Sequence, residues 1–577
     1  MATAAAPRST PGPWLHGPWS DLLLGCGLGY AVVFGIQLFA WNALVWAVPL
    51  TLAPILSVLF GTPHYGATLL RVYARWRDVR HYFVFSVIAT GLLAAGFVQG
   101  LWDPRVAALL VTLYATWSPW HYTGQNYGVA LLFLGRRGVA VDATTKRLLH
   151  LGFMASYVLV FLTLHGARAG ATYQPVQANA PLTLLQLGIP ARIAGPAFDA
   201  TLLAYAGLLV AAIGRLLRRG SLAALAPALL LLATQAIWFA IPVTVQQLSG
   251  LPGFAPYSPE NGGYTMFWVA AAHAAQYLWV TRYYAARSHG AAGGLRVGGY
   301  YAVALAAGAA LWSGLPALVA HGGLGPTIDA AALTALVAAT VNLHHFVLDG
   351  AIWKLRDRRI ASVLLRPVAE TSPVEGSSSW HRAARVLQGG VLAFGLVAAL
   401  ATALQLVLGE YAVRRPLRAG ELVQAERGTR WLGALGRDGA DLHDEIARVA
   451  LERRLLPLAE KELRVAVERG PTANTWRGLG RVAEERGDWR DAALDYERAV
   501  ALDPKSVFAL ARGGYAWRRA GEPARGQELL ERAAALDPGD RILMRLVELG
   551  RSAGSGGVED AAAASASSAQ PARLDRQ

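Results

Sequence analysis

The sequence contains a single cysteine, Cys26, among 577 residues. One cysteine excludes an intrachain disulfide and any metal site built from several thiolates. Charged side chains are also scarce, at 16% of the chain, whereas soluble domains carry about a quarter. The shortage is concentrated between residues 20 and 410, where apolar runs of roughly 20 residues recur. Runs of that length can cross a bilayer as helices.

We therefore predict an all-α protein with a polytopic transmembrane domain followed by a soluble helical tail. The expected organisation is an N-terminal segment, a membrane domain, a linker, helical repeats and a disordered tail, at residues 1–19, 20–410, 411–441, 442–550 and 551–577. The membrane domain is expected to have eleven spans, at 20–40, 43–62, 82–101, 105–121, 147–167, 197–216, 221–246, 264–284, 297–320, 327–348 and 386–408. The segment Thr123–Gly135 is too short to span and is expected to be re-entrant or interfacial.

The net charge of +15 is best explained by membrane topology, because most arginines of residues 20–410 lie in short loops between spans. Positive charge follows every even-numbered span, so those ends are predicted to be cytoplasmic. We therefore expect an integral protein of a bacterial inner membrane, with a cytoplasmic N-terminus and a periplasmic tail. Arg414, Arg415 and Arg418 are an exception, because they follow the eleventh span on the expected outer side. Nucleic acid is not an expected partner.

The tail contains an internal repeat with a period of 34 residues. The segments "TWRGLGRVAEERGDWRDAALDYERAVALDP" and "FALARGGYAWRRAGEPARGQELLERAAALDP" align, so that Gly487 matches Gly521 and Pro504 matches Pro538. The period, the Trp476-x-x-Leu-Gly pattern and the closing Leu-Asp-Pro resemble the tetratricopeptide repeat (TPR). The resemblance implies stacked helix pairs that bind a protein or peptide.

Five of the 13 histidines lie at or inside apolar spans, and all five are on even-numbered spans; they are His64, His121, His273, His344 and His345. His64 precedes the next basic residue by seven positions, and His273 and His345 each precede theirs by nine. At 1.5 Å per residue, these three lie within about 3 Å of one another in depth. His121 fits the same layer if Thr123–Gly135 lies flat in the interface. The sequence therefore predicts a shared metal site near the cytoplasmic leaflet, with all five histidines as ligands.

Polar neighbours accompany these histidines at helical spacing. Gln125 follows His121 by four residues, Gln276 follows His273 by three, and Asp349 follows His345 by four. Each pair shares one helical face. Metal-bound imidazole usually has its second ring nitrogen held by a carboxylate, amide or carbonyl. Gln125, Gln276 and Asp349 are therefore expected to support the reaction, and Asp349 could also be a ligand.

Imidazole and carboxylate without thiolate suit iron, zinc, copper or manganese. A histidine-rich site at a membrane surface is distantly similar to the integral-membrane non-haem iron oxygenases and desaturases, and at most to the Brp/Blh carotene-cleaving dioxygenases. The desaturase boxes HxxxH and HxxHH are absent. The resemblance implies a metal-dependent oxidoreductase, with iron as the expected metal and a lipid or isoprenoid as the substrate.

Other functions stay open at this point. A membrane glycosyltransferase that uses a polyprenyl-linked sugar can combine many helices with a TPR tail, although the first external loop, 40–42, contains no acidic residue. A haem protein would use two of the histidines as axial ligands. A transporter or an assembly scaffold would use them to relay protons or to pack.

Overall fold

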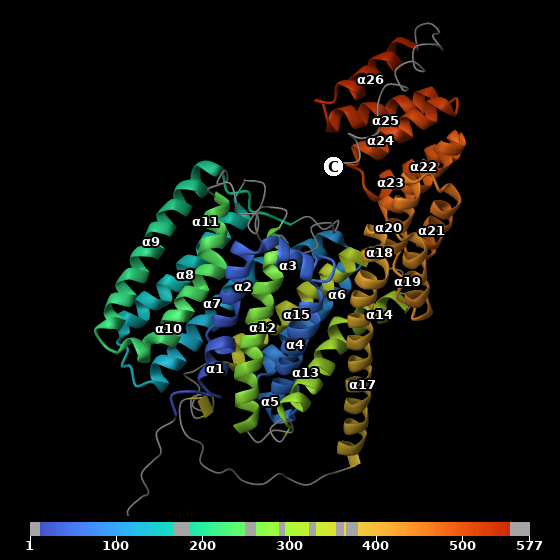
Figure 1. Cartoon of the computed structure of the whole chain (residues 1–577). Coiled ribbons are helices and arrows are strands. Elements are labelled where there is room, and N and C mark those ends of the chain that lie inside the picture. The colour runs from blue at the N-terminus through green and yellow to red at the C-terminus, as the bar shows by residue number, and fades with distance from the viewer. Residues whose placement is uncertain are drawn as a thin grey trace, which may run out of the picture. The chain divides into compact units, whose positions relative to one another are not determined.

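The computed structural model describes residues 12–166, 184–247, 261–287, 295–321, 330–353, 360, 363–364 and 379–553. Within these ranges the fold is helical, with one isolated bridge between Gly166 and Ile189 and no strand. The chain forms two compact units, Met1–Leu404 and Gln405–Gln577 (Figure 1). The prediction of an all-α chain is confirmed. The basic run 354–359, and the expected disordered tail beyond Ala553, lie outside the described residues.

The first unit is a bundle of helices that run side by side (Figure 1). In the described part of the chain, five helices are long and apolar enough to cross a membrane, or six if a bent pair at Pro18–Phe39 counts as one span. The five are Ala143–His165 (α8), Ala191–Leu217 (α9), Leu222–Gln247 (α10, η4 and α11), Ala332–Ile352 (in α15) and Gly389–Arg418 (α17, η6 and α18). Eleven spans are therefore not confirmed.

Several predicted spans are helical but are broken or short. The first bends by 55° between η1 (Asp21–Gly25) and α2 (Leu28–Phe39). The second is divided between α3 (Trp41–Ala47) and η2 (Ser57–Gly61), and the third is the apolar helix Val84–Gly100 (η3 and α6). The ninth is divided between α13 (Val297–Trp312) and α14 (Gly314–His321). Wide π-helical turns and breaks of this kind are common at functional sites.

The helix α7 (Pro104–Arg136) is 33 residues long and includes the segment Thr123–Gly135, so this segment continues the helix of the predicted fourth span and is not a separate element. Asp103 caps its start by accepting a hydrogen bond from the Arg105 backbone N–H. Its buried face carries polar groups such as Thr123 and Asn126.

Buried fractions separate the inner from the outer helices of the first unit. Ala332–Ile352 of α15 (Ala330–Ile352) is 78% buried, whereas α9 is 17% buried and lies at an edge of the bundle (Figure 1). The helix α4 (Thr62–Tyr73) packs very closely against α13: a Cβ added to Gly66 would lie 1.7 Å from the Ala304 carbonyl oxygen. Glycine at such crossings lets helix backbones approach closely.

The second unit stacks antiparallel helix pairs. Their bounds are Ala440–Glu452 (α20), Leu456–Arg469 (α21), Ala473–Arg486 (α22), Trp489–Leu502 (α23), Val507–Arg519 (α24), Pro523–Leu536 (α25) and Arg541–Ala553 (α26). The core between the pairs contains Tyr496, Trp517 and Leu530. The stretch predicted as a linker, 411–441, is helical over Leu422–Ala434 (α19), which buries Ala425.

A buried ionic cluster joins α20 and α21. The Nδ1 of His443 lies 2.7 Å from Glu462, and its Nε2 lies 3.3 Å from Asp438. Burial by itself lowers the pKa of His443, but the hydrogen bonds and charges of Glu462 and Asp438 outweigh burial, and the pKa is raised above 6.5. A raised pKa in the folded state stabilises the unit at low pH, and this contribution is lost as the pH rises through the folded-state pKa.

We therefore expect α20 and α21 to lose stability as the pH rises above 6.5. Hydrogen exchange of the full chain, corrected for intrinsic exchange rates, measures the opening free energy of these helices. In His443→Gln, which cannot titrate, the same free energy should no longer fall over this pH range. A wild-type opening free energy that does not change with pH would show that the cluster adds no net stability.

Candidate metal centre

Four helices of the first unit each contribute one histidine to a single cluster. His64 lies in the first turn of α4, His121 in the middle of α7, His273 in α12 (Gly262–Arg287) and His345 in α15. Pro63 occupies the first turn of α4, where a missing backbone N–H costs nothing. This turn therefore forms just where η2 ends, and it positions His64.

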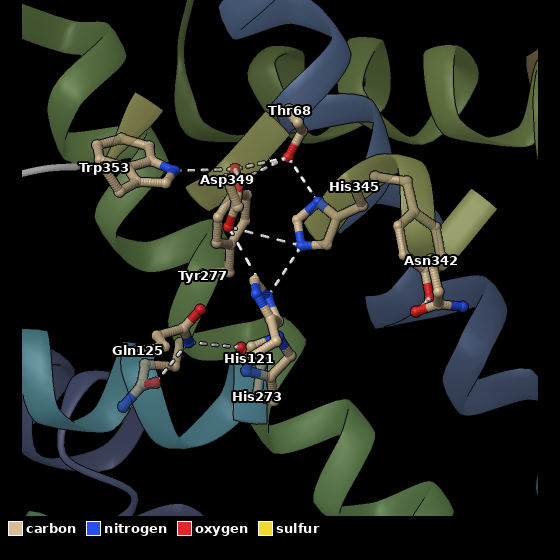
Figure 2. Close-up of polar contacts among 11 residues, drawn as sticks. Thr68, His121, Gln125, His273, Tyr277, Asn342, His345, Asp349 and Trp353 are labelled. Atoms are coloured by element: carbon tan, nitrogen blue, oxygen red, sulfur yellow. Dashed lines mark hydrogen bonds and ion pairs between the residues drawn. The ribbon is translucent and has the colours of Figure 1, made fainter. Parts of the chain in front are cut away.

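The four imidazoles are in contact. One nitrogen from each ring lies within 4.8 Å of the corresponding nitrogens of the other three. The ring centroids of His64 and His345 are 4.1 Å apart, and those of His121 and His273 are 5.0 Å apart. Figure 2 shows His121, His273 and His345 turned toward a common region. The four histidines of this cluster, His64, His121, His273 and His345, are called the four-histidine cluster below.

The cluster contains buried nitrogen atoms with no hydrogen-bond partner among the described residues. They are Nδ1 of His64 and both ring nitrogens of His273. The Nε2 atoms of His121 and His345 face each other at 3.2 Å. A buried polar atom without a partner costs about 1–3 kcal/mol. A metal ion binds one nitrogen of each ring, so it would satisfy one of the two His273 nitrogens and remove part of that cost, and the donor set fits a metal.

Asp349 lies beside the cluster, outside the set of four nitrogens. Its Oδ1 accepts hydrogen bonds from Tyr277 (2.6 Å) and Thr68 (3.3 Å). Its Oδ2 lies 3.6 Å from Nε2 of His345 and 3.8 Å from Nε2 of His121 (Figure 2). Oδ1 therefore holds the carboxylate in place, and Oδ2 faces the two imidazoles. This is the position expected of a proton acceptor or of a further metal ligand.

Thr68 is the residue that orients His345. Its hydroxyl oxygen lies 2.9 Å from Nδ1 of His345, which leaves Nε2 of the same ring directed into the cluster. The hydroxyl is also 2.6 Å from the Tyr277 hydroxyl, and Trp353 donates to Tyr277 at 3.1 Å. A hydrogen bond to the second ring nitrogen fixes the orientation of a metal-binding imidazole.

Replacing Thr68 by valine keeps the side-chain shape but removes the hydroxyl. We expect Thr68→Val to weaken metal binding by about 10- to 100-fold, because the His345 ring loses its anchor. Titration against a competing chelator measures this change. The matched control is Thr340→Val, because among the described residues the Thr340 hydroxyl donates only to the Leu336 carbonyl of its own helix. Equal affinities in the two variants would contradict the role of Thr68.

His344 is not part of the four-histidine cluster. Its Nε2 lies 3.1 Å from the hydroxyls of both Tyr73 and Thr90, and its ring stacks on Tyr73. Successive residues of a helix point about 100° apart, so His344 and His345 cannot both face one point. The structure therefore places four of the five predicted ligands together and separates the fifth.

The two predicted glutamines bond to each other and to the backbone. Gln125 donates to the His273 carbonyl at 3.2 Å and to Gln276. Gln276 donates to the Gly25 carbonyl at 2.7 Å and to Asn126 at 3.1 Å. Neither amide contacts an imidazole nitrogen in these bonds, so they position the α12 backbone around His273 (Figure 2).

Sequence reasoning missed Thr68, Tyr277 and Tyr122. Tyr122 stacks on His273, with ring centroids 3.8 Å apart. A regular spacing could have identified the first two: Thr68 follows His64 by four residues, and Tyr277 follows His273 by four. Residues four apart share a helical face, so a polar residue one turn after a ligand tends to face the same site.

Residues 473–506 match the tetratricopeptide repeat family, so the second unit contains a TPR. The prediction of a TPR is confirmed for this segment. No family match falls on the first unit. No curated protein matches the chain. TPRs commonly mediate protein interactions, which supports a protein partner for the second unit.

Proposed function

We propose that the first unit is an integral-membrane metalloenzyme that oxidises an apolar molecule at the four-histidine cluster. One observation carries the proposal: four buried imidazoles from four helices converge, and three of their nitrogen atoms lack any hydrogen-bond partner among the described residues. Burying such atoms is unfavourable unless they bind something. Polar groups inside apolar helices are costly and are typical of functional sites.

Iron is the metal that this proposal favours. Imidazole donors with a nearby carboxylate and no thiolate also accept zinc, copper or manganese. When bound, iron would supply redox chemistry with dioxygen, which oxygenases, hydroxylases and desaturases share. The close packing of the rings argues against a haem, because imidazoles with centroids 4.1–5.0 Å apart leave no space for a flat macrocycle between them.

The chain's own residues then have separate roles. The four histidines hold the metal, and Thr68 fixes the His345 ring. Oδ2 of Asp349 is placed to accept a proton, because Tyr277 occupies its other oxygen. Phe346 stacks on His121 with centroids 4.5 Å apart, and it helps to exclude water from the cluster.

The membrane assignment and its orientation belong to the same proposal. We infer eleven spans with a cytoplasmic N-terminus, since positive charge follows the even-numbered spans. Helices that carry the site, such as α7 and α12, would cross the bilayer because apolar neighbours surround their polar faces. An odd number of spans would place the TPR unit in the periplasm of a bacterium, where it would bind a protein or peptide.

Oxygen-isotope labelling tests the proposed reaction. Iron-loaded protein in detergent would be incubated with a bacterial lipid extract under ¹⁸O₂, and lipid products would be analysed by mass spectrometry. We expect iron-dependent oxygen consumption with a new lipid product. That product carries ¹⁸O for an oxygenase or hydroxylase, and has two hydrogens fewer for a desaturase. His273→Ala is expected to abolish both. A wild type that binds iron but consumes no more oxygen than His273→Ala would contradict oxidation.

A further inference from the structure

We propose that the substrate reaches the four-histidine cluster sideways from the bilayer, through an opening between α7 and α15 next to His121. This inference rests on the proposed function and adds the route of entry and the ligand that meets the substrate. His121 is slightly exposed, with 9% of its side chain accessible, whereas His64, His273 and His345 are buried. The cluster is therefore covered on the sides of three ligands and is closest to the surface at His121.

The two helices pack along one seam as far as His121. Phe346 of α15 contacts three aromatic rings of α7: Tyr114 at 6.3 Å, Trp117 at 6.2 Å and His121 at 4.5 Å between centroids. These residues of α7 are spaced by three and four positions, as residues on one helical face are. Both helices run in the same direction along the seam, since Leu336 and Phe346 of α15 pack near the first and middle turns of α7.

One turn beyond this contact, both helices present glycine on the seam. Gly124 and Gly128 follow His121 by three and seven residues, and Gly350 follows Phe346 by four. Among the described residues, no heavy atom lies within 4 Å of a Cβ built on any of these three glycines. Among the described residues, side chains therefore fill the seam up to His121 and Phe346 and leave it open directly after them.

The surface that leads to this opening is apolar and aromatic. Trp117 and Trp120 of α7 are 39% and 45% exposed, and Leu109 and Leu113 continue the same strip toward the start of the helix. Trp120 packs edge-on against Tyr157 of α8 at 5.3 Å. Exposed tryptophan and leucine on a membrane helix face lipid, so the molecule that approaches here carries a hydrocarbon chain.

Open glycines alone do not indicate a ligand, but the cluster behind them does. Both ring nitrogens of His273 are buried and have no hydrogen-bond partner in the described part of the chain. His121 lies in the same cluster as His273, and it comes from α7, the helix that also carries Gly124 and Gly128. A chain that enters past Gly124 would therefore meet the metal at His121.

Bulky substitutions at the opening test this route. Gly124→Phe and Gly350→Phe would place an aromatic ring at it, and no heavy atom of the described residues lies within 4 Å of a Cβ built on either glycine. The matched control is Gly207→Phe on α9, which is also exposed and has no heavy atom within 4 Å of its added Cβ among the described residues. Each purified protein would be loaded with Co²⁺, whose visible spectrum reports ligand binding. The probes are 1-decylimidazole, which carries a hydrocarbon chain, and azide, which is small and soluble.

We expect both probes to change the cobalt spectrum of the wild type. In Gly124→Phe and Gly350→Phe, the Kd for 1-decylimidazole should rise at least about tenfold while the Kd for azide stays the same. Gly207→Phe should behave as the wild type does. The proposed route would be wrong if all four proteins bound 1-decylimidazole equally, or if the phenylalanine variants lost affinity for both probes equally. Neither result would contradict the proposed function. A wild type that binds no cobalt would contradict the proposed function itself and with it this inference.

Discussion

Substituting His345 by alanine is expected to remove the bound metal, whereas substituting the adjacent His344 should leave it in place. His345 supplies a cluster nitrogen, and its other nitrogen is anchored by Thr68 at 2.9 Å. Loss of a ligand from a four-coordinate site should weaken binding by more than the roughly 10- to 100-fold that loss of a supporting residue causes. His344 instead bonds Tyr73 and Thr90.

Elemental analysis of the two purified variants, under conditions that load the wild type, measures this difference. The comparison is well matched, because the two residues are neighbours on α15 and both are buried or half-buried. Equal metal contents in the two variants would show that the four-histidine cluster is not the binding site. Loss from His344→Ala alone would place the metal on the other face of α15.

The second large effect is expected from Gly66→Ala. The added methyl group would lie 1.7 Å from the Ala304 carbonyl oxygen, and a Cβ on the facing Gly308 would lie 1.8 Å from the Thr62 carbonyl oxygen. Neither backbone can yield without separating α4 from α13. We expect a destabilisation of about 3 kcal/mol or more, since overpacking against rigid backbone is among the costliest single changes.

Because α4 carries both His64 and Thr68, Gly66→Ala should also lower metal content in the protein that still folds. Thermal unfolding and elemental analysis measure the two effects. The control is Gly91→Ala on α6 (Thr90–Gly100), where no heavy atom of the described residues lies within 4 Å of the added Cβ. Alanine there should be neutral or slightly stabilising, because it favours helix more than glycine does. Similar stabilities for the two variants would contradict the close α4–α13 contact.

Simple helix geometry made much of the candidate site predictable. Counting residues from His64, His273 and His345 to the next arginine or lysine placed the three at one depth, and the structure brings them together. The depth of His121 required a flat interfacial segment after it, but α7 continues as a helix to Arg136. His121 can still reach the depth of the other histidines if α7 is tilted or shifted along its axis relative to the other helices. Residue counts give neither the tilt nor the shift of a helix.

The rotation of each helix was the harder part to predict. His344 and His345 are adjacent, so their predicted depths are almost the same. Only the packing of α15 against α4 and α7 decides which of the two rings points inward. Gln125 and Gln276 share helical faces with histidines, yet they bond the His273 carbonyl and each other. A shared face limits which groups can meet, but the tertiary contacts choose among several possible partners.

The helical breaks in the first unit were also not predictable from hydropathy. The segments 43–62 and 297–320 are apolar throughout, yet both are divided into shorter helices. The close approach of α4 and α13 depends on Gly66 and Gly308, whose neighbours come from distant parts of the chain. The TPR was easier, because each repeat contacts its neighbours and carries its pattern in 34 residues.

X-ray absorption spectroscopy at the metal edge, combined with elemental analysis of the wild-type protein, tests the central claim most directly. The account predicts one metal ion per chain, with about four imidazole nitrogens at roughly 2.0–2.2 Å. A carboxylate oxygen from Asp349 would be compatible with this shell as a fifth ligand. No bound metal after purification under metal-replete conditions, or a first shell without histidine, would contradict it.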